Sequence, residues 1–536
     1  MSDPVSAAGR ARTAEGDHGD LTPGSPDEEV DPDSGSTGAG GGRPHWHDLP
    51  QGFQVQLDLS SVIGRDRRHL LGGSPMSMLT LSERAVSMFD DDGRLVVCDE
   101  ASATIARRLL TTQLGRPRPM FGPDADSVSV VVPVRDNQQG IDRLLASLRG
   151  VARVIVVDDG SAEPVRVPPP AVSAQCPPVE VIRFQTSRGP AAARNAGAAA
   201  TTSEFVAFLD SDVVPEHDWL AKMLAHFSDE RVALVAPRIR PMSVDGGPTL
   251  RYEALKSSLD MGRVEAAVVP GTPVAYVPSA AMIVRHSVFD ELGGFDEDMY
   301  VAEDVDLCWR LHGVGAVMRY EPVATVTHDH RGRLVSAFGR RRFYGTGAAL
   351  LAGRHDRTGA PLVLNSALAV LLAGLFSGTR AGLAAAVFAA VFILRQLRTR
   401  MTDLPHSARI AAALTARSVG FGVLQMASAL CRSYWPLSLL LALLSKRFRL
   451  ILAAAALCDG IVEWVRIEIL DPDPVPRLGP VLFVAYKRMD DLAYGAGLWQ
   501  GAIAHRSATA LVPVLRTRAE ARDTATRRPV GRPRRS

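Results

Sequence analysis

Residues 205–213 read Phe-Val-Ala-Phe-Leu-Asp-Ser-Asp-Val, an apolar run that ends in two carboxylates, Asp210 and Asp212. Such a run predicts a buried strand of an open α/β sheet, and ligands of these sheets bind at the carboxyl ends of the strands. An isolated Asp-x-Asp is also typical of a solvated turn after a core strand. The sequence around this stretch is needed to choose between a binding site and a turn.

Alternating strands and helices flank this stretch. Apolar runs at 128–134 and 154–157 predict strands, and residues 179–184 are expected to form a third. Between them, residues 140–149 place apolar side chains on one helical face, and residues 190–200 begin with a proline suited to a first helical turn. Strands that alternate with helices are typical of a doubly wound α/β sheet.

The chain is long enough for several domains, because 536 residues exceed the usual size of one. A net charge of +2 gives no reason to expect a nucleic-acid partner. Residues 1–50 are acidic and rich in glycine and proline, and residues 516–536 are rich in arginine, so both ends are expected to be disordered tails. Five cysteines without metal-ligand spacing and the lack of an amino-terminal signal peptide fit a cytoplasmic compartment.

Residues 51–118 form a small patterned unit before the α/β region. Short alternating strands and two helices, the first with Ser82 as a plausible cap, predict a winged-helix-like module. Its second helix has only Arg107 and Arg108 as a basic cluster and lacks a base-reading face, which argues against DNA binding. A small packing domain and a peptide- or substrate-presenting domain remain open. Residues 125–358 are then expected to form the main α/β domain.

Residues 360–515 are apolar and expected to be mostly helical. Most apolar runs here are shorter than the ~20 residues that span a bilayer, and they occupy 362–376, 381–394, 419–430, 435–444 and 450–461. They fit short spans, a re-entrant hairpin or amphipathic helices lying among lipid headgroups, with a buried helical bundle as the alternative. Basic residues between the runs favour contact with membrane lipid, at the cytoplasmic face of the cell membrane.

Three acidic sites follow successive elements: Asp158-Asp159, Asp210-x-Asp212 and Glu303-Asp304. Transfer of a sugar from a nucleotide diphosphate needs such a layout. A divalent cation, Mg²⁺ or Mn²⁺, must neutralise the leaving diphosphate, and such cations take carboxylate ligands. The attacking acceptor hydroxyl needs a base. The first pair can therefore bind uracil and ribose, the second can bind the metal, and the third can supply the base.

Six ordered segments resemble the family-2 inverting glycosyltransferases, which have the GT-A fold, a doubly wound mixed sheet. The segments are Val-Val-Val-Pro-Val-Arg (130–135), Val-Val-Asp-Asp-Gly-Ser (156–161), Arg-Gly-Pro-Ala-Ala-Ala-Arg-Asn-Ala-Gly (188–197), Phe-Leu-Asp-Ser-Asp (208–212), Gly-Gly-Phe-Asp-Glu (293–297) and Glu-Asp-Val-Asp-Leu-Cys-Trp-Arg (303–310). Six matches in order are far more specific than any one alone.

The resemblance implies a role for each matching residue. Asp304 is implied as the general base, with Glu303 orienting it. Asp158 is implied to contact uracil, and Asp212 to bind the metal. The remaining residues implied in binding the UDP-sugar donor are Pro133, Asp159, Arg188, Arg194, Asp210 and Ser211.

His328 and a basic run follow a strand-like segment at 323–327. His328 is either a further metal ligand, as in some GT-A enzymes, or a packed histidine. Arg340 and Arg342 of the basic run are expected to support the site. Processive members of the family carry Gln-x-x-Arg-Trp in this region. This chain instead has Arg-Arg-Arg-Phe-Tyr at 340–344, which argues against processive synthesis through a membrane channel.

A narrower resemblance comes from the ends of the folded chain. Leu-Gly-Gly-Ser-Pro at 71–75 and Met-Asp-Asp-Leu-Ala-Tyr-Gly-Ala-Gly-Leu-Trp-Gln-Gly at 489–501 are similar to the glycosyltransferases of mycofactocin biosynthesis in actinobacteria. That family adds β-linked glucose to a peptide-derived redox cofactor, and its amino-terminal module resembles PqqD-like peptide-binding domains. The resemblance implies UDP-glucose as donor and the mycofactocin precursor as acceptor. The alternatives are a lipid-linked or cell-wall glycan acceptor and a non-catalytic peptide-binding protein.

Overall fold

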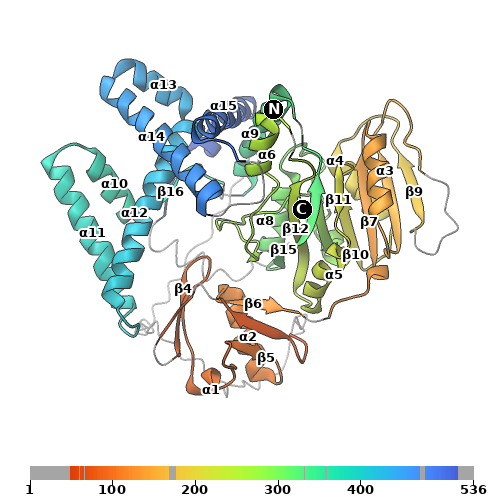
Figure 1. Cartoon of the computed structure of the whole chain (residues 1–536), viewed down its shortest axis with the longest axis horizontal. Helices are drawn as coiled ribbons and strands as arrows, with labels where there is room; N and C mark the ends of the chain where they lie inside the picture. The colour runs from red at the N-terminus through yellow and green to blue at the C-terminus, as the bar shows by residue number, and fades with distance from the viewer. Residues whose placement is uncertain are drawn as a thin grey trace, which may run out of the picture.

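The structure, a computed structural model, describes residues 49–516 apart from 59–60, 65–66, 120, 168–176, 245, 331, 356–358 and 471–476. The expected tails at 1–50 and 516–536 lie almost wholly outside the described residues. Within the described part, a central sheet with helices on both faces lies between a small amino-terminal unit and a group of carboxyl-terminal helices (Figure 1).

The central sheet is mixed and contains nine strands in the order β11-β15-β12-β14-β10-β7-β8-β9, with β13 paired to β15. Strands β10, β7, β8 and β9 run parallel, whereas β14 is antiparallel to both β10 and β12. The strands are β7 (Val128–Val134), β8 (Arg153–Asp158), β9 (Val179–Arg183), β10 (Phe205–Leu209), β11 (Val213–Pro215), β12 (Val232–Pro241), β13 (Ala266–Ala267), β14 (Ala281–Arg285) and β15 (Val317–His328). This GT-A-like mixed sheet confirms the expected fold class of the main domain.

Two apolar layers enclose the sheet. Helices α3 (Gln138–Ser147) and α5 (Trp219–Leu224) pack on one face, and α4 (Pro190–Ala199), α7 (His286–Glu291) and α8 (Glu303–Gly313) pack on the other. Every residue of β10 is buried, because side chains pointing to either face meet one of the two layers. Residues 205–209 therefore form a central strand, and Asp210 follows its last apolar residue.

Local sequence signals set the starts of the helices next to the site. Asn137 caps α3 by accepting a hydrogen bond from the Gly140 amide. Gly189 has a φ of +93°, a conformation that favours glycine, and Pro190 follows in the first turn of α4. Each of these helices begins directly after a loop at the carboxyl end of a parallel strand.

The amino-terminal unit contains two small antiparallel sheets and two helices. Its elements are β1 (Gln54–Leu57), β2 (Val62–Ile63), β3 (His69–Gly72), β4 (Ser77–Thr80), α1 (Glu83–Val86), β5 (Arg94–Val96), α2 (Glu100–Thr112) and β6 (Gly115–Arg118). Ser82 caps α1, as predicted. Pro117 lies in β6 opposite Val55. Arg107 forms an ion pair with Asp229 of the central domain at 2.6 Å.

The carboxyl-terminal region is helical, as expected, and α11, α12 and α14 extend beyond the apolar runs at 381–394, 419–430 and 450–461. The helices of this region are α10 (Ser366–Phe376), α11 (Arg380–Arg400), α12 (Ser407–Arg432), α13 (Trp435–Leu444), α14 (Lys446–Val465) and α15 (Pro480–Ala504). In the central domain, α6 (Pro248–Leu255) and α9 (Leu334–Arg354) pack beside each other and beside α15. A short parallel pair, β16 (Val363–Asn365) and β17 (Val514–Arg516), joins the two ends of the region. By length and composition, α11 and α12 could cross a membrane.

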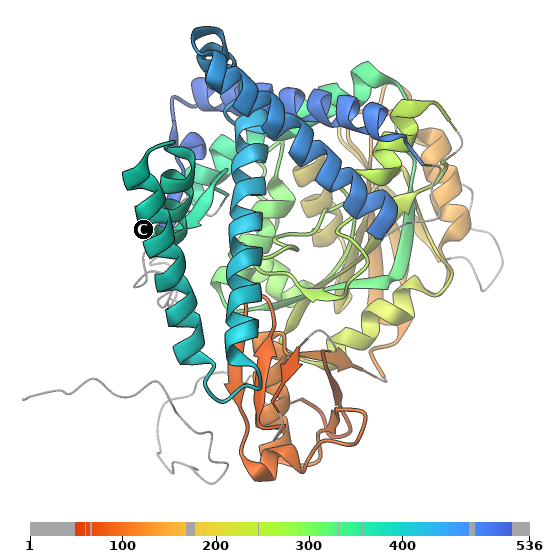
Figure 2. The ribbon, with the colours of Figure 1, turned by 60° about the vertical axis from the view of Figure 1, so that its left-hand side comes forward.

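Helix α15 packs directly on α9, backbone against backbone. A Cβ at Gly497 would collide with the carbonyl oxygen of Arg342, and one at Gly501 would collide with Thr346. Conversely, a Cβ at Gly345 would collide with the carbonyl oxygen of Tyr494. Figure 2 shows α15 crossing the top of α12, next to the central sheet. Small residues therefore bring the carboxyl-terminal region to the edge of the central domain.

Candidate functional site

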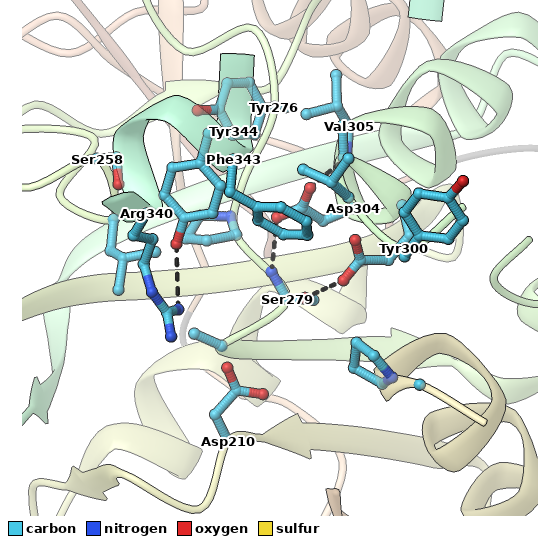
Figure 3. A pocket seen from close by; sticks show the side chains of 18 of the residues that line it. Asp210, Ser258, Tyr276, Ser279, Tyr300, Asp304, Val305, Arg340, Phe343 and Tyr344 are labelled. Carbon is cyan, nitrogen blue, oxygen red and sulfur yellow. Dashed lines mark hydrogen bonds between the residues drawn. The ribbon is translucent and has the colours of Figure 1, made fainter. Parts of the chain in front are cut away.

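A cavity of about 810 Å³ lies at the carboxyl ends of the parallel strands. Pro133 follows the apolar core of β7, Asp159 follows β8, and Asp210, Ser211 and Asp212 follow β10; all of them line the cavity. Helix α8 supplies Glu303 and Asp304 from the opposite side (Figure 3). The fold thus brings together in one cavity carboxylates that are almost 150 residues apart in sequence.

Arg194 connects the Asp-x-Asp stretch with helix α8. Its guanidinium donates to Asp210 at 2.6 Å and to Glu303 at 3.0 Å, and its side chain is only 4% exposed. Burial raises the pKa of Asp210, against the nearby positive charge of Arg194. An arginine fixed by two carboxylates is positioned to hold both walls of the cavity at a set separation.

Asp304 is a half-buried carboxyl group at the start of α8. Its oxygens accept hydrogen bonds from the backbone amides of Val305 at 2.8 Å and Ser279 at 3.3 Å. Burial, followed by the charge of Glu303, raises its pKa to about 7. A carboxyl group with this pKa can take up a proton near neutral pH, which a general base must do.

The first acidic pair divides into a structural and a cavity residue. Asp158 is fully buried and accepts hydrogen bonds from Ser161 and Val165 amides and from Arg183. It does not line the cavity, whereas Asp159 does. The geometry therefore does not support direct contact of Asp158 with the nucleotide, because every hydrogen bond of its carboxylate is directed inside the protein.

The predicted arginines lie at different distances from the cavity. Arg340 lines it and donates to the Tyr344 hydroxyl at 3.3 Å. Arg188 and Arg342 do not line it: Arg188 pairs with Glu297 on the surface, and Arg342 donates to Gln500 of α15. Successive residues of a loop or helix point in different directions, and the roles of Arg188 in donor binding and of Arg342 in supporting the site stay predictions. Arg341, not Arg342, is the second arginine of the run that reaches the cavity.

His328 faces the Asp-x-Asp stretch from the end of β15. Its Nε2 lies 3.4 Å from the Asp212 carboxylate, and its Nδ1 lies 2.7 Å from His330 Nδ1. Burial, followed by the charge of His328, lowers the pKa of His330 to about 3, so His330 is neutral. Among the described residues no group of three His, Cys, Asp or Glu side chains has the arrangement of a metal site. Asp212 and His328 supply two ligands at most.

Aromatic side chains form much of the rest of the lining. They are Tyr276, Tyr300, Trp309, Phe343, Tyr344 and Tyr494. Arg432, at the end of α12, lines the cavity as well. Sequence reasoning does not single out these residues as site residues. Tyr494 lies inside the segment 489–501 that carries the narrower resemblance, but helix periodicity alone does not tell which of its residues faces a cavity.

Comparison with known proteins identifies the family. The family model described as glycosyl transferase family 2 matches residues 129–293. Over 473 residues, the chain is 48% identical to the pre-mycofactocin glycosyltransferase of Mycobacterium tuberculosis, with 88% of this chain and 99% of that protein covered. The chain belongs to the pre-mycofactocin glycosyltransferases. Membership of this family makes it a transferase, a glycosyltransferase acting in mycofactocin biosynthesis.

More distant similarity is confined to part of the chain. The archaeal glycosyltransferase AglE of Haloferax volcanii is 25% identical over 33% of this chain and 59% of its own length. The solved mannosyltransferase PcManGT from Pyrobaculum calidifontis, in complex with GDP-Man and Mn²⁺, is 18% identical with a TM-score of 0.34, covering 67% of this chain and 90% of that one. The match to AglE covers a third of this chain, whereas the match to the Mycobacterium protein covers 88% of it.

Proposed function

We propose that this enzyme transfers glucose from UDP-glucose to the mycofactocin precursor with inversion, giving a β-linkage. The observation that carries the proposal is the half-buried Asp304 carboxyl, with a pKa of about 7, facing the same cavity as Asp210 and Asp212. As base, Asp304 takes the proton of the acceptor hydroxyl while that oxygen attacks the anomeric carbon and the UDP leaves from the opposite face. One-step displacement of this kind inverts the anomeric centre.

The proposed donor site lies at the Asp-x-Asp end of the cavity. Asp159 and Asp210 would bind the nucleoside, and Pro133 and Ser211 line the cavity beside them. Asn137 holds Ser211 through a hydrogen bond of 3.1 Å to its hydroxyl. Arg194 acts as a positioning residue, since its guanidinium is already occupied by Asp210 and Glu303. Arg340 remains available to the diphosphate, because cationic donors stabilise phosphate oxygens.

A divalent cation fits the pair formed by Asp212 and His328. A carboxylate oxygen and an imidazole nitrogen 3.4 Å apart suit Mn²⁺ or Mg²⁺, with further ligands from diphosphate oxygens and water. When bound, the cation would neutralise charge on the leaving diphosphate. We expect Asp212→Asn to raise the half-saturating Mn²⁺ concentration by more than about tenfold, since even outer partners of metal ligands change affinity about 10–100-fold. Mn²⁺ binding followed by electron paramagnetic resonance measures this without turnover.

The test of the reaction is a product analysis. Purified enzyme, UDP-glucose, Mn²⁺ and the mycofactocin precursor should give a product heavier by one or more hexoses, and digestion by β-specific but not α-specific glucosidase should reverse the gain. No hexose addition with any UDP-hexose would contradict the proposal. Hexose found instead in the lipid extract of membranes would favour a lipid-linked acceptor.

We further propose that the carboxyl-terminal helices attach the enzyme to a membrane surface. Large apolar side chains are exposed on several of these helices, among them Phe388, Phe421, Leu443, Leu444 and Leu450, each at least 70% exposed. Basic residues lie between the apolar stretches, including Lys446, Arg447 and Arg449 at the start of α14. Apolar side chains flanked by basic ones fit the boundary between acyl chains and anionic headgroups.

A further inference from the structure

The cavity extends beyond the proposed donor site into an aromatic end. Tyr276 lies here, and its surroundings include Asp304, Tyr344, Tyr494 and Arg432. In Figure 3, Asp304 lies between Asp210 below and Tyr276 above, with Tyr344 to its left. A group bound at the aromatic end would therefore meet the proposed base from the side opposite the Asp-x-Asp stretch.

The lining of this end is unusual for the chain. Aromatic residues make up only 6% of the sequence, yet four of its eight tyrosines line this cavity. Within the described part of the chain, the hydroxyls of the half-buried Tyr276 and Tyr494 make no hydrogen bond, so both can bind a ligand in the cavity. Aromatic faces with free hydroxyls suit a ligand that offers a ring to stack on and polar groups to bind.

Two residues of this end come from the carboxyl-terminal helices. The Arg432 guanidinium lies 3.9 Å from the centre of the Tyr494 ring, a cation–π arrangement. Its ion pair with Asp491 is long, at 3.9 Å, and its guanidinium donates no hydrogen bond to any described residue. Arg432 thus has donors available for a carbonyl or other oxygen of a ligand, while its charge already rests on an aromatic face.

Glycine contacts fix these two residues in place. A Cβ at Gly495 would collide with the carbonyl oxygen of Arg432, and a Cβ at Gly345 would collide with that of Tyr494. The backbones that carry Arg432 and Tyr494 are therefore held by direct contact with α15 and α9, respectively. Such contacts would not be needed if the helices served only as a membrane anchor.

We propose that the aromatic end is the acceptor subsite, and that Tyr494 and Arg432 select an acceptor bearing an aromatic ring and a nearby hydrogen-bond-accepting oxygen. This rests on the proposed function, since it names where and how the acceptor of that reaction binds. On this proposal the carboxyl-terminal helices complete the active site and determine its specificity. The Tyr494 ring would stack on the aromatic ring of the acceptor and orient an acceptor hydroxyl toward Asp304.

The experiment uses the full-length protein with the variants Tyr494→Leu, Tyr494→Phe and Arg432→Gln. Leu492→Ala is the matched control, because Leu492 lies on the same helix, is 42% exposed and does not line the cavity. Acceptor binding is measured by calorimetry with pre-mycofactocin and no donor. Transfer gives KM for acceptor and donor, and UDP-glucose hydrolysis without acceptor reports the donor site alone.

Tyr494→Leu should weaken acceptor binding about tenfold or more, because the aromatic stacking face is lost. The KM for the acceptor should rise by a similar factor. The acceptor affinity of Tyr494→Phe should stay within about threefold of wild type. Arg432→Gln should weaken acceptor binding even though Tyr494 is unchanged. Leu492→Ala should keep the acceptor affinity, the donor KM and the hydrolysis rate of wild type, and circular dichroism spectra and melting temperatures like those of wild type show that the other variants fold. Indole and phenol should compete with the acceptor, whereas cyclohexanol should not.

Two results would overturn the proposal: equal acceptor affinity for Tyr494→Leu and wild type with hydrolysis retained, or no acceptor binding by wild type. Competition by cyclohexanol as strong as by phenol would overturn the aromatic selectivity. Absence of hydrolysis and transfer in a wild-type protein that still binds acceptor through Tyr494 would contradict the proposed function alone.

Discussion

Asp304 shows how neighbouring residues set the chemistry of a single carboxyl group. Ala302, two residues earlier, has a φ of +64°, a left-handed conformation that is unfavourable for a residue with a side chain. Strain of this kind persists where the surrounding structure requires it, and it is frequent at active sites. Here the turn at Ala302 starts α8 and brings Asp304 to the backbone amides of Val305 and Ser279.

Asp304→Asn should remove transfer while leaving donor binding intact. A general base contributes about 10²- to 10⁴-fold to a rate, so we expect kcat to fall by at least about a hundredfold. UDP affinity, measured by calorimetry, should change less than about twofold. Glu297→Gln, a surface carboxylate near the site, is the control and should keep full activity. Equal loss of UDP binding and transfer in Asp304→Asn would rule out a role restricted to the base.

The raised pKa of Asp304 predicts a pH profile. Asp304 accepts a proton only when ionised, and its pKa of about 7 leaves roughly a tenth of it ionised at pH 6. kcat/KM should therefore fall about tenfold per pH unit below 7 and level off above it. Steady-state rates between pH 5 and 9 measure the acid limb. A profile flat down to pH 5 would mean that the base has an ordinary carboxyl pKa.

At the scale of elements, contact between α9 and α15 joins the two parts of the site. Helix α9 carries Arg340 and Tyr344, and α15 carries Tyr494. An ion pair of 2.8 Å between Arg341 and Asp490 adds to the glycine contacts along the same helix pair. Removing either partner of such a buried ion pair is costly, because the other partner is left as an uncompensated buried charge. The separation of α9 and α15 therefore determines the shape of the aromatic end.

Gly497→Ala should lower stability although alanine favours helices. The added Cβ would meet the carbonyl oxygen of Arg342, a backbone atom that cannot turn away, so the helices must separate. Overpacking of this kind costs about 1–3 kcal/mol. Gly420→Ala is the matched control: Gly420 is also helical but has open space around it, so alanine there should stabilise by up to about 1 kcal/mol. Thermal melts compare the two. Equal melting temperatures would contradict close packing at Gly497.

At the scale of the whole molecule, the carboxyl-terminal helices have two different sides. Toward the central domain they contribute Arg432 and Tyr494 to the cavity. Elsewhere α11 and α12 remain mostly exposed: only 11% and 17%, respectively, of an apolar 18-residue stretch in each helix is buried. Figure 1 shows α10, α11, α13 and α14 on the side away from the central sheet. An enzyme held to a membrane by these helices would keep its cavity next to the attached part.

Membrane binding should depend on the exposed leucines of α13. We expect Leu443→Asp combined with Leu444→Asp to lower sedimentation with vesicles of phosphatidylcholine and phosphatidylglycerol by more than about tenfold, because each buried leucine contributes about 1.5–3 kcal/mol. Val264→Asp combined with Val323→Asp, two exposed residues of the central domain, is the control and should sediment like wild type. Equal binding by both double variants, or no binding by wild type, would contradict attachment through α13.

The sequence by itself determined the central sheet and its carboxylates. Val128–Val134 coincides with the predicted strand, and Asp210, Asp212 and Asp304 reach the cavity, because apolar runs and strand ends are local features. Only the tertiary structure separated Asp158 from Asp159 and Arg342 from Arg341, since the direction of a side chain depends on packing.

Tertiary structure also decided what residues 205–213 face. The strand and its acidic pair can be predicted from that stretch, whereas Tyr494 and Arg432 come from helices nearly 300 and more than 200 residues further along the chain. Their place in the cavity depends on glycines that let α9 and α15 touch. The sequence shows where a helix has a glycine. Which backbone that glycine contacts is determined only when helices distant in the sequence pack together.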